Sequence, residues 1–197
     1  MKIKILSFCG SSRKGSLNQQ LLNIAEAGAI AAGAEVTRLR LSDLRLPLYE
    51  GDLEAEYGLP EEAQTFKTMI AEHHAILIGT PEHNGGYTAL LKNSIDWASR
   101  PTAGDPSGLA PFQGKPAALV SASPGAMGGL RSQIALQVTL NKIGVMVIPR
   151  SFALGAAHKA FDALGILVDS NAEKMVRDVG AALVGVTASL VQKSLAA

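Results

Sequence analysis

The chain has 197 residues, of which 47% are hydrophobic and 18% are charged, and its formal net charge is +1. This length and balance suit one globular domain and exclude a disordered chain. The weak net charge argues against a nucleic-acid partner and against attraction to a charged membrane surface. The single cysteine, Cys9, excludes an internal disulfide framework and a metal site built from several cysteines, and we expect no metal.

We expect neither a secretory signal at the N-terminus nor a membrane-spanning helix. The N-terminus enters a short apolar stretch directly, without the longer apolar core and cleavage site of a secretory signal. No uninterrupted apolar run reaches the roughly 18 residues of a spanning helix. The apolar tail at 181–197 is broken by polar residues, so we expect a core-facing helix there. Cytoplasmic localisation and no membrane partner are the expectation.

Five short apolar runs predict buried strands, each followed by a helical pattern. The runs are 3–8, 35–41, 75–80, 117–121 and 145–148. The second run alternates between apolar and polar residues, which suits a strand with one edge facing solvent. Repeated strand–helix alternation predicts a doubly wound α/β fold. We expect a five-stranded parallel sheet with helices on both faces, a three-layer sandwich, forming a single domain over 1–197.

Start signals mark the predicted helices. The helical patterns begin at Ser16 and Pro60, cover 89–98 and 130–143, and begin again at Ser170. Ser16 with Gln19, and Ser170 with Glu173, have the spacing of a capping box. Gly33 is a plausible stop for the first helix.

The loop at 9–18, between the first strand and the first helix, is dense in hydrogen-bond donors. Ligands of open α/β sheets bind beyond the carboxyl ends of the strands. A helix N-terminus there offers free N–H groups and partial positive charge. Ser11, Ser16 and Asn18 can donate to phosphate oxygens, and Arg13 can add a charge-assisted contact. We expect this loop to bind the phosphate of a mononucleotide; an ordinary solvated turn is the alternative.

Two better-known phosphate motifs do not fit this loop. A P-loop needs lysine after its second glycine, and Ser16 follows Gly15 here. A dinucleotide fingerprint needs glycine at position 12 and an acidic residue ending the second strand. The chain has Ser12 and the basic stretch 38–41 instead.

A stiff loop at 80–87 follows the third strand. It lies beside the phosphate loop if the strand order is 2-1-3-4-5. Pro81 stiffens it, and its glycines permit positive φ. Such a loop can aim backbone N–H groups at a flat heteroaromatic ring, on which His83 can stack. The alternative is a connector with a surface histidine.

The loop at 121–131, after the fourth strand, is rich in glycine. That density predicts close backbone approach to a ligand. Ser121 ends the strand, as a nucleophilic serine does in hydrolases. The sequence G-x-S-x-G is absent, which argues against a serine hydrolase.

Three motifs occur in order along the chain. They are Gly10-Ser11-x-Arg13-x-Gly15-Ser16-x-Asn18, Thr80-Pro81-Glu82-His83-Asn84-Gly85 and Leu91-Lys92-Asn93-Ser94-Ile95-Asp96-Trp97-Ala98-Ser99-Arg100. Together they resemble the NADPH-dependent FMN reductase family, which includes bacterial quinone, chromate and azo-dye reductases. The likeness runs from Lys2 to about Arg150. It implies a flavodoxin-like fold of order 2-1-3-4-5 that holds FMN tightly without a covalent bond.

The resemblance also assigns residues to the cofactor. It places the phosphate on Ser11, Arg13, Ser16, Leu17 and Asn18. It places the ring against Pro81, Glu82, His83, Asn84 and Gly85, with Ser121 and Gly125 beyond the fourth strand. The family commonly has tyrosine where this chain has His83, so the contact that covers the ring differs here.

The implied activity passes two electrons by a ping-pong mechanism from NADPH or NADH through FMN to quinones or related acceptors (azo, nitro, chromate, free flavin). No side chain is expected to act as acid or base, because the flavin carries the chemistry. Backbone N–H groups at 82–85 and 121–125 are the expected stabilisers of charge on the reduced ring. Arg13, Lys14 and Arg131 can favour a 2′-phosphate on the donor, depending on their placement.

The resemblance further implies a homodimer or homotetramer. Asn93, Asp96, Trp97 and Arg100 fall in the region that the family uses for the contact, and the alternative for Trp97 is a core position. The long loops at 42–59 and 100–114 can wall a site or form such a contact.

Two other functions share this fold. One is a flavodoxin-type electron carrier, although such carriers tend to be strongly acidic and this chain is nearly neutral. The other is a non-catalytic interaction module. Cys9 is more simply a small buried filler than a redox thiol.

Overall fold

Parallel strands form the centre of the computed structural model, which describes residues 1–196. The strands β1 (Lys4–Cys9), β2 (Glu35–Leu39), β3 (Ala75–Gly79), β4 (Pro116–Ala122) and β5 (Met146–Val147) pair in the order β2-β1-β3-β4-β5. Every pairing among them is parallel. This confirms the predicted doubly wound sheet, with β2 at one edge.

The edge of the sheet beside β4 differs from the prediction, because two short strands, β5 and β6, stand where one continuous strand was expected. Ile148 still donates its N–H to Ala117 O at 2.8 Å, but Pro149 has no N–H to continue the ladder. A sixth strand, β6 (Phe152–Leu154), then resumes the pairing with β4, where Phe152 lies opposite Val120. The predicted run at 145–148 is therefore only the first half of this edge.

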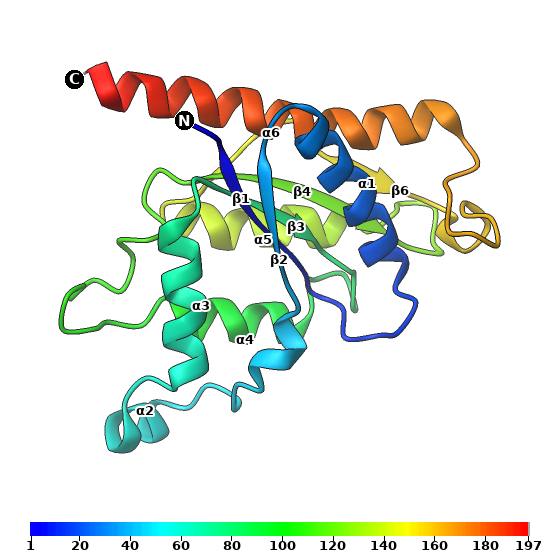
Figure 1. Cartoon of the computed structure of the whole chain (residues 1–197). Coiled ribbons are helices and arrows are strands. Elements are labelled where there is room, and N and C mark those ends of the chain that lie inside the picture. Colours follow the sequence, from blue (N-terminus) through cyan, green and yellow to red (C-terminus); the bar gives the residue numbers. More distant parts are fainter. Residues whose placement is uncertain (197) are drawn as a thin grey trace.

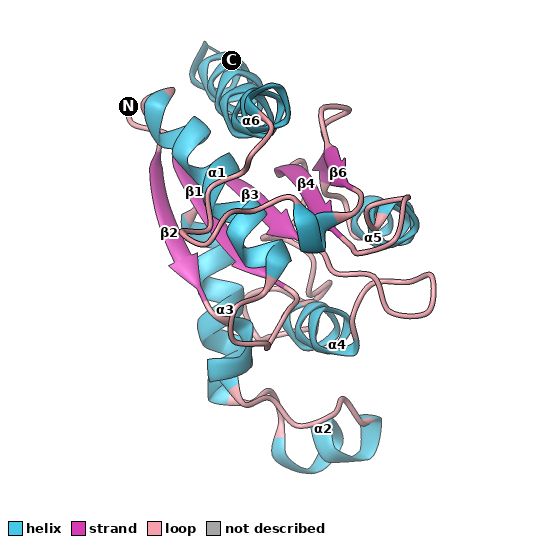
Figure 2. Cartoon of the chain, turned by 90° about the vertical axis from the view of Figure 1, so that its right-hand side faces the viewer, coloured by secondary structure: helices cyan, strands magenta, loops and turns pink. Residues whose placement is uncertain are grey.

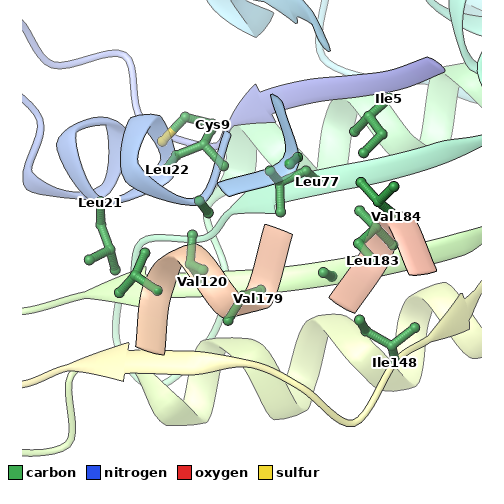
Figure 3. Close-up of a cluster of buried hydrophobic side chains, with 14 of the residues drawn as sticks. Ile5, Cys9, Leu21, Leu22, Leu77, Val120, Ile148, Val179, Leu183 and Val184 are labelled. Carbon is green, nitrogen blue, oxygen red and sulfur yellow. The ribbon is translucent and has the colours of Figure 1, made fainter. Parts of the chain in front are cut away.

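Helices cover both faces of the sheet (Figure 1). On one face, α1 (Leu17–Ala31) and α6 (Ser170–Ala196) bury a core with inward residues such as Ile5, Leu77 and Val120, seen in Figure 3. On the other face lie α3 (Glu61–Glu72), α4 (Ala89–Ala98) and α5 (Leu130–Lys142). The side chains of β1 alternate between these two cores, as the period of a strand requires.

The helix starts match the capping prediction only in part. The Ser16 hydroxyl accepts the Gln19 N–H at 3.3 Å, as predicted, but the Gln19 side chain donates to Asn23 instead of reaching back. At α6 the cap is Asp169 rather than Ser170, because the Asp169 carboxylate accepts the N–H of Asn171 at 2.8 Å.

The long loop at 42–59 is partly helical, with a 3-10 turn (Leu41–Leu44) and α2 (Gly51–Tyr57). Helix α2 lies apart from the sheet, below α3 and α4 (Figures 1 and 2). Trp97 is fully buried, and its indole N–H donates to Pro47 O at 2.8 Å. Asn93 also donates to that carbonyl, and Arg100 pairs with Glu54 at 2.9 Å. Three of the residues expected at a subunit contact therefore hold this loop inside the chain.

The loop at 100–114 is held in a similar way. Lys67, which is almost fully buried on α3, forms an ion pair with Asp105 at 3.0 Å. Its Nζ also donates to Arg100 O at 2.6 Å.

Helix α6 has a stretch of 24 residues, Ser170–Lys193, that is long and apolar enough to cross a membrane, judged by length and composition alone. The core helices of globular proteins can have the same length and composition. Val176, Val179 and Leu183 are buried in the core that α6 shares with α1, which agrees with the expected core-facing helix.

The contact between α1 and α6 depends on two glycines. A Cβ atom on Gly28 would lie 2.0 Å from Arg177 O, and one on Gly180 would lie 1.9 Å from Ala25 O. Both clashes are with backbone atoms, which a side-chain rotation cannot relieve. The two helices can pack this closely only while both positions lack a side chain.

We expect Gly28→Ala to lower the free energy of unfolding by roughly 1–3 kcal/mol or more, because the added methyl overpacks a backbone contact. Gly185→Ala is the matched control. Gly185 lies in α6 with open space around it, so alanine should stabilise the helix there by about 0.5–1 kcal/mol. Urea denaturation of the two variants measures both effects. Equal stability of Gly28→Ala and the parent would contradict the close packing.

Candidate functional site

The loops after β1, β3 and β4 meet at the carboxyl edge of the sheet and enclose a pocket of about 170 Å³. Its lining is Ser11, Arg13, Gly15, Ser16, Leu17, Asn18, Pro81, Glu82, His83, Ala122, Ser123 and Pro124. The structure thus brings together all five residues predicted for the phosphate and three of those predicted for the ring. Asn84, Gly85, Ser121 and Gly125 do not line the pocket.

The first turn of α1 supplies the donors at the floor of this pocket. Helix geometry leaves the N–H groups of Leu17 and Asn18 without an intrahelical acceptor. The hydroxyls of Ser11 and Ser16 lie beside them, and each accepts one backbone N–H. The Ser11 hydroxyl is still able to donate, while the Ser16 hydroxyl also bonds to the Cys9 thiol. Arg13 is exposed and forms no ion pair with any described residue. This donor set suits an anion.

Asn18 holds the pocket together through its side chain. Its amide donates to Ala122 O and accepts the Ala122 N–H, both at 2.8 Å, and the residue is buried. The side chain is therefore held against β4 by one N–H and by its carbonyl oxygen, and its second N–H and the backbone N–H remain for a ligand. Asn18 and Ala122 are 104 residues apart. No local sequence signal therefore shows whether the Asn18 side chain bonds to a ligand or to β4.

Sequence reasoning missed Thr88, which fixes the phosphate loop from the other side. The Thr88 hydroxyl donates to Gly10 O at 2.7 Å and accepts the Leu91 N–H at 3.2 Å, so it caps α4. A Cβ atom on Gly10 would lie 2.9 Å from the Thr88 hydroxyl oxygen. Gly10 is therefore required for this close approach.

The loop after β3 forms a tight turn. His83 and Gly86 exchange N–H···O bonds of 2.9 and 3.0 Å, and Asn84 and Gly85 both have positive φ. This is the geometry that Asn-Gly favours in hairpin turns. The N–H groups of Glu82, Asn84 and Gly85 have no acceptor among the described residues. The His83 side chain is exposed.

Glu82 connects this turn to α5. Its side chain is only 8% exposed and pairs with Arg131, whose Nε lies 2.7 Å from Oε1. The second carboxylate oxygen, Oε2, is buried without a hydrogen-bond partner in the described part of the chain. An unsatisfied acceptor of this kind, in the wall of a pocket, is costly unless a bound molecule satisfies it.

The glycine-rich loop after β4 packs against the protein itself. Ser121 is fully buried, donates to Gly128 O at 2.7 Å and accepts from the Gln133 amide at 2.7 Å. A Cβ atom on Gly129 would lie 2.8 Å from the Ser121 Cβ, and one on Gly128 would lie 2.6 Å from the Ala153 backbone. Gly128 and Gly129 are therefore required for close packing within the chain, whereas Ala122, Ser123 and Pro124 of the same loop line the pocket.

The N–H groups of this loop are also occupied. Ala122 donates to Asn18, Ser123 to Leu154 O and Gly125 to the Ser123 hydroxyl, while Pro124 has no N–H. Within the stretch 121–125, where N–H groups were expected to stabilise charge, those of Ala122, Ser123 and Gly125 are thus already bonded. The turn at 82–85 has three N–H groups without an acceptor among the described residues, those of Glu82, Asn84 and Gly85.

Cys9 ends β1 with its side chain directed at α1, beside Leu22 (Figure 3). It is 3% exposed, and burial raises the pKa of its thiol to about 11. The thiolate needed for redox chemistry is therefore scarce at neutral pH. This supports the interpretation of Cys9 as a packing residue.

Comparison with known proteins gives one consistent result. Residues 3–159 match the sequence model of the NADPH-dependent FMN reductase family. The NAD(P)H-dependent FMN reductase of Pseudomonas aeruginosa is 37% identical over 176 residues, covering 89% of this chain and 90% of that one. The NAD(P)H:quinone oxidoreductase of Solanum tuberosum is 36% identical over 190 residues, covering 92% and 91%.

The solved structures agree with this result. The flavoenzyme NAD(P)H:(acceptor) oxidoreductase FerB of Paracoccus denitrificans aligns with a TM-score of 0.76 at 30% identity, covering 95% of this chain and 98% of that one. An archaeal flavodoxin, at 12% identity and a TM-score of 0.59, shares the fold.

We expect the Cys9 thiol of the native protein to react with a disulfide reagent at least about 100-fold more slowly than that of the urea-unfolded chain at pH 8. The reason is the raised pKa together with the lack of access. Release of the chromophoric thiol measures both rates. Equal rates would contradict the buried, protonated state.

Proposed function

Because the chain belongs to the NADPH-dependent FMN reductase family, we propose that it passes two electrons from NADPH or NADH through bound FMN to a second substrate. The acceptors are quinones or related azo, nitro, chromate or free-flavin compounds, and donor and acceptor use the site in turn, a ping-pong sequence. The observation that carries the proposal is the set of unpaired donors around the first turn of α1, joined in one pocket to the turn after β3.

The donor set suits the terminal phosphate of FMN. The N–H groups of Leu17 and Asn18 and the hydroxyls of Ser11 and Ser16 bind the oxygens, while Arg13 adds a charge-assisted bond. A volume of about 170 Å³ is below the range of pockets that enclose a whole ligand of this size. The pocket therefore encloses the phosphate end and leaves the ring on the open side.

The ring side is formed by the turn after β3. Pro81, Glu82 and His83 line it, and Gly85 with Asn84 keeps the turn tight. When bound, FMN supplies a ring that accepts a hydride and passes electrons on. The free N–H groups of Glu82, Asn84 and Gly85 are fixed by the turn before any reaction, so they can stabilise negative charge without reorganising. No acid or base side chain is assigned.

The rival function with the same cofactor is a flavodoxin-type electron carrier. Its docking depends on a strong surface field, and the near-zero net charge of this chain supplies none. The relatives named as reductases align with this chain over about nine-tenths of their length, which favours an enzyme with its own substrates. A cytoplasmic location is part of the proposal, supported by a single reduced cysteine.

We expect the purified protein to be yellow or to take up FMN, and its visible band to bleach with NADPH under nitrogen and return on addition of a quinone. Steady-state NADPH oxidation should require both FMN and the quinone. A chain that binds FMN but turns over no acceptor would favour the carrier, and one that binds no FMN would overturn the proposal.

Arg13→Ala should weaken FMN binding about ten- to a hundredfold, since a charge-assisted hydrogen bond is worth roughly 1.5–3 kcal/mol. Titration of the apo-protein with FMN measures this. Lys174→Ala, which removes an equal charge from the exposed face of α6, is the control and should bind FMN like the parent. Unchanged affinity in Arg13→Ala would exclude Arg13 as a phosphate ligand.

We also propose a homodimer or homotetramer that uses α5. Leu130, Ile134 and Val138 recur every four residues on this helix and are 40%, 55% and 67% exposed. The row begins next to Arg131, which pairs with Glu82 in the wall of the pocket. A second copy packed on this row would lie beside the open ring side.

Ile134→Glu should therefore shift the protein toward the monomer in sedimentation velocity, because the contact would bury an unpaired charge. Met175→Glu, at a similarly exposed apolar position on α6, should keep the parent's assembly state. A monomeric parent would contradict this contact.

A further inference from the structure

A second hollow, of about 510 Å³, lies where the strands of the sheet begin, opposite the pocket proposed for FMN. Lys115 and Pro116, at the start of β4, line it, and so does His74, which directly precedes β3. Thr187 and Val191 line it from the last part of α6, which lies at the same end of the sheet as the start of β1 (Figure 1). The function proposed above uses none of these residues.

The lining of this hollow is mostly apolar. Pro111, Pro116 and Val191 are among its walls, and no aspartate or glutamate of the described chain lines it. Of its polar side chains, the Thr187 hydroxyl donates to Leu183 O at 2.6 Å and is buried. A hollow of this volume, with apolar walls and a few polar groups, is typical of sites for small molecules.

Lys115 brings an ammonium group to the hollow without a counter-ion. Its Nζ donates to His73 O, and it forms no ion pair with any residue that the structure describes. Two of its three N–H donors are therefore left for another partner. Burial lowers the pKa of Lys115 to about 8, because an ammonium taken from water without a carboxylate beside it is disfavoured. A bound anion would supply the missing charge.

His74 adds a neutral donor next to this cation. The backbone N–H of Lys4 donates to His74 Nδ1 at 2.9 Å. Because Nδ1 is held as the acceptor, the neutral ring carries its proton on Nε2, and this N–H has no acceptor among the described residues. Burial, and then the positive charges of Lys115 and Lys4, lower the pKa of His74. The ring is therefore neutral at neutral pH and lies close enough to Lys115 to be affected by its charge.

The two donors and the apolar walls point to one class of ligand. An ammonium and an imidazole N–H match the two oxygens of a carboxylate, and the walls suit a hydrocarbon body. We propose that this hollow binds a small monocarboxylic acid with an aliphatic or aromatic body, whose carboxylate is held by Lys115 Nζ and His74 Nε2. The site is separate from the pocket proposed for FMN, so the inference does not rest on the proposed function.

Octanoate is the probe for this site, and 1-octanol, which has the same chain length without the charge, is the matched ligand. Calorimetric titration of the protein as purified should show saturable binding of octanoate, with octanol bound at least about tenfold more weakly. Lys115→Met keeps an unbranched apolar side chain and should weaken octanoate binding about ten- to a hundredfold, while octanol binding stays the same. Lys174→Met, at an exposed position near the start of α6, should bind both ligands like the parent.

Proton uptake gives a second measurement that needs no variant. A bound carboxylate favours the charged form of Lys115 and raises its pKa. At pH 8, where about half of Lys115 is uncharged, octanoate binding should therefore take up about half a proton from the buffer, and octanol binding none. The difference between the binding heats in phosphate and in Tris measures this uptake. The other titratable groups around the two donors are His73, His74 and Lys4, and His74, with its lowered pKa, is neutral at pH 8.

Several results would overturn this inference: no binding of octanoate, equal affinity for octanoate and octanol, no proton uptake at pH 8, or unchanged octanoate affinity in Lys115→Met. If Lys115→Met fails to fold without its bond to His73 O, the octanol comparison and the proton uptake of the parent decide. FMN affinity and NADPH oxidation should be the same in the folded variant and the parent, because Lys115 lies outside the first pocket. Failure of the reductase proposal would therefore show in those two measurements and leave this one unaffected.

Discussion

The two hydrogen bonds between the Asn18 amide and the Ala122 backbone are the constraint on which the rest of the site depends. They join the start of α1 to the end of β4. Thr88 adds a second tie, from α4 to Gly10. With both ties made, Leu17 and Asn18 line a pocket whose loops are already held in place, so an anion can bind there at little cost in ordering the loop. The parallel sheet is what lets residues so distant in sequence meet at one edge.

Much of this arrangement could be predicted from the sequence because its signals are local. The apolar runs, the Ser16 cap and the donor-rich loop are each recognised within a few residues, and repeated crossovers predict a parallel sheet. The strand order came from the family resemblance. The use of Asn18 could not be predicted, since a side-chain amide can serve a phosphate or a distant strand equally well. The break at Pro149 was visible in the sequence, but the return of the chain to the same edge at β6 required the pairing with β4.

The glycines also show the difference between features that nearby residues reveal and features that depend on distant parts of the chain. Several glycines mark a close approach, but the sequence does not say which neighbour approaches. At Gly10 the neighbour is Thr88, at Gly129 it is Ser121, and at Gly28 it is the backbone of α6. None of these three neighbours is a ligand. The turn at Asn84 and Gly85 differs because its backbone N–H groups have no acceptor among the described residues and both residues have positive φ.

The charges of the molecule are better understood by their pairing than by their sum. Carboxylates pair with Arg100 and Lys67, where they hold the two long loops, and with Arg131, where Glu82 lines the pocket. Glu26 orients Arg38 in the same way. Arg13 and Lys14 have no such partner in the described chain, and they lie on the loop before α1, beside the positive end of that helix. Unpaired cations beside the positive end of a helix favour an anion there, and this is why the phosphate of FMN is proposed for this edge of the sheet.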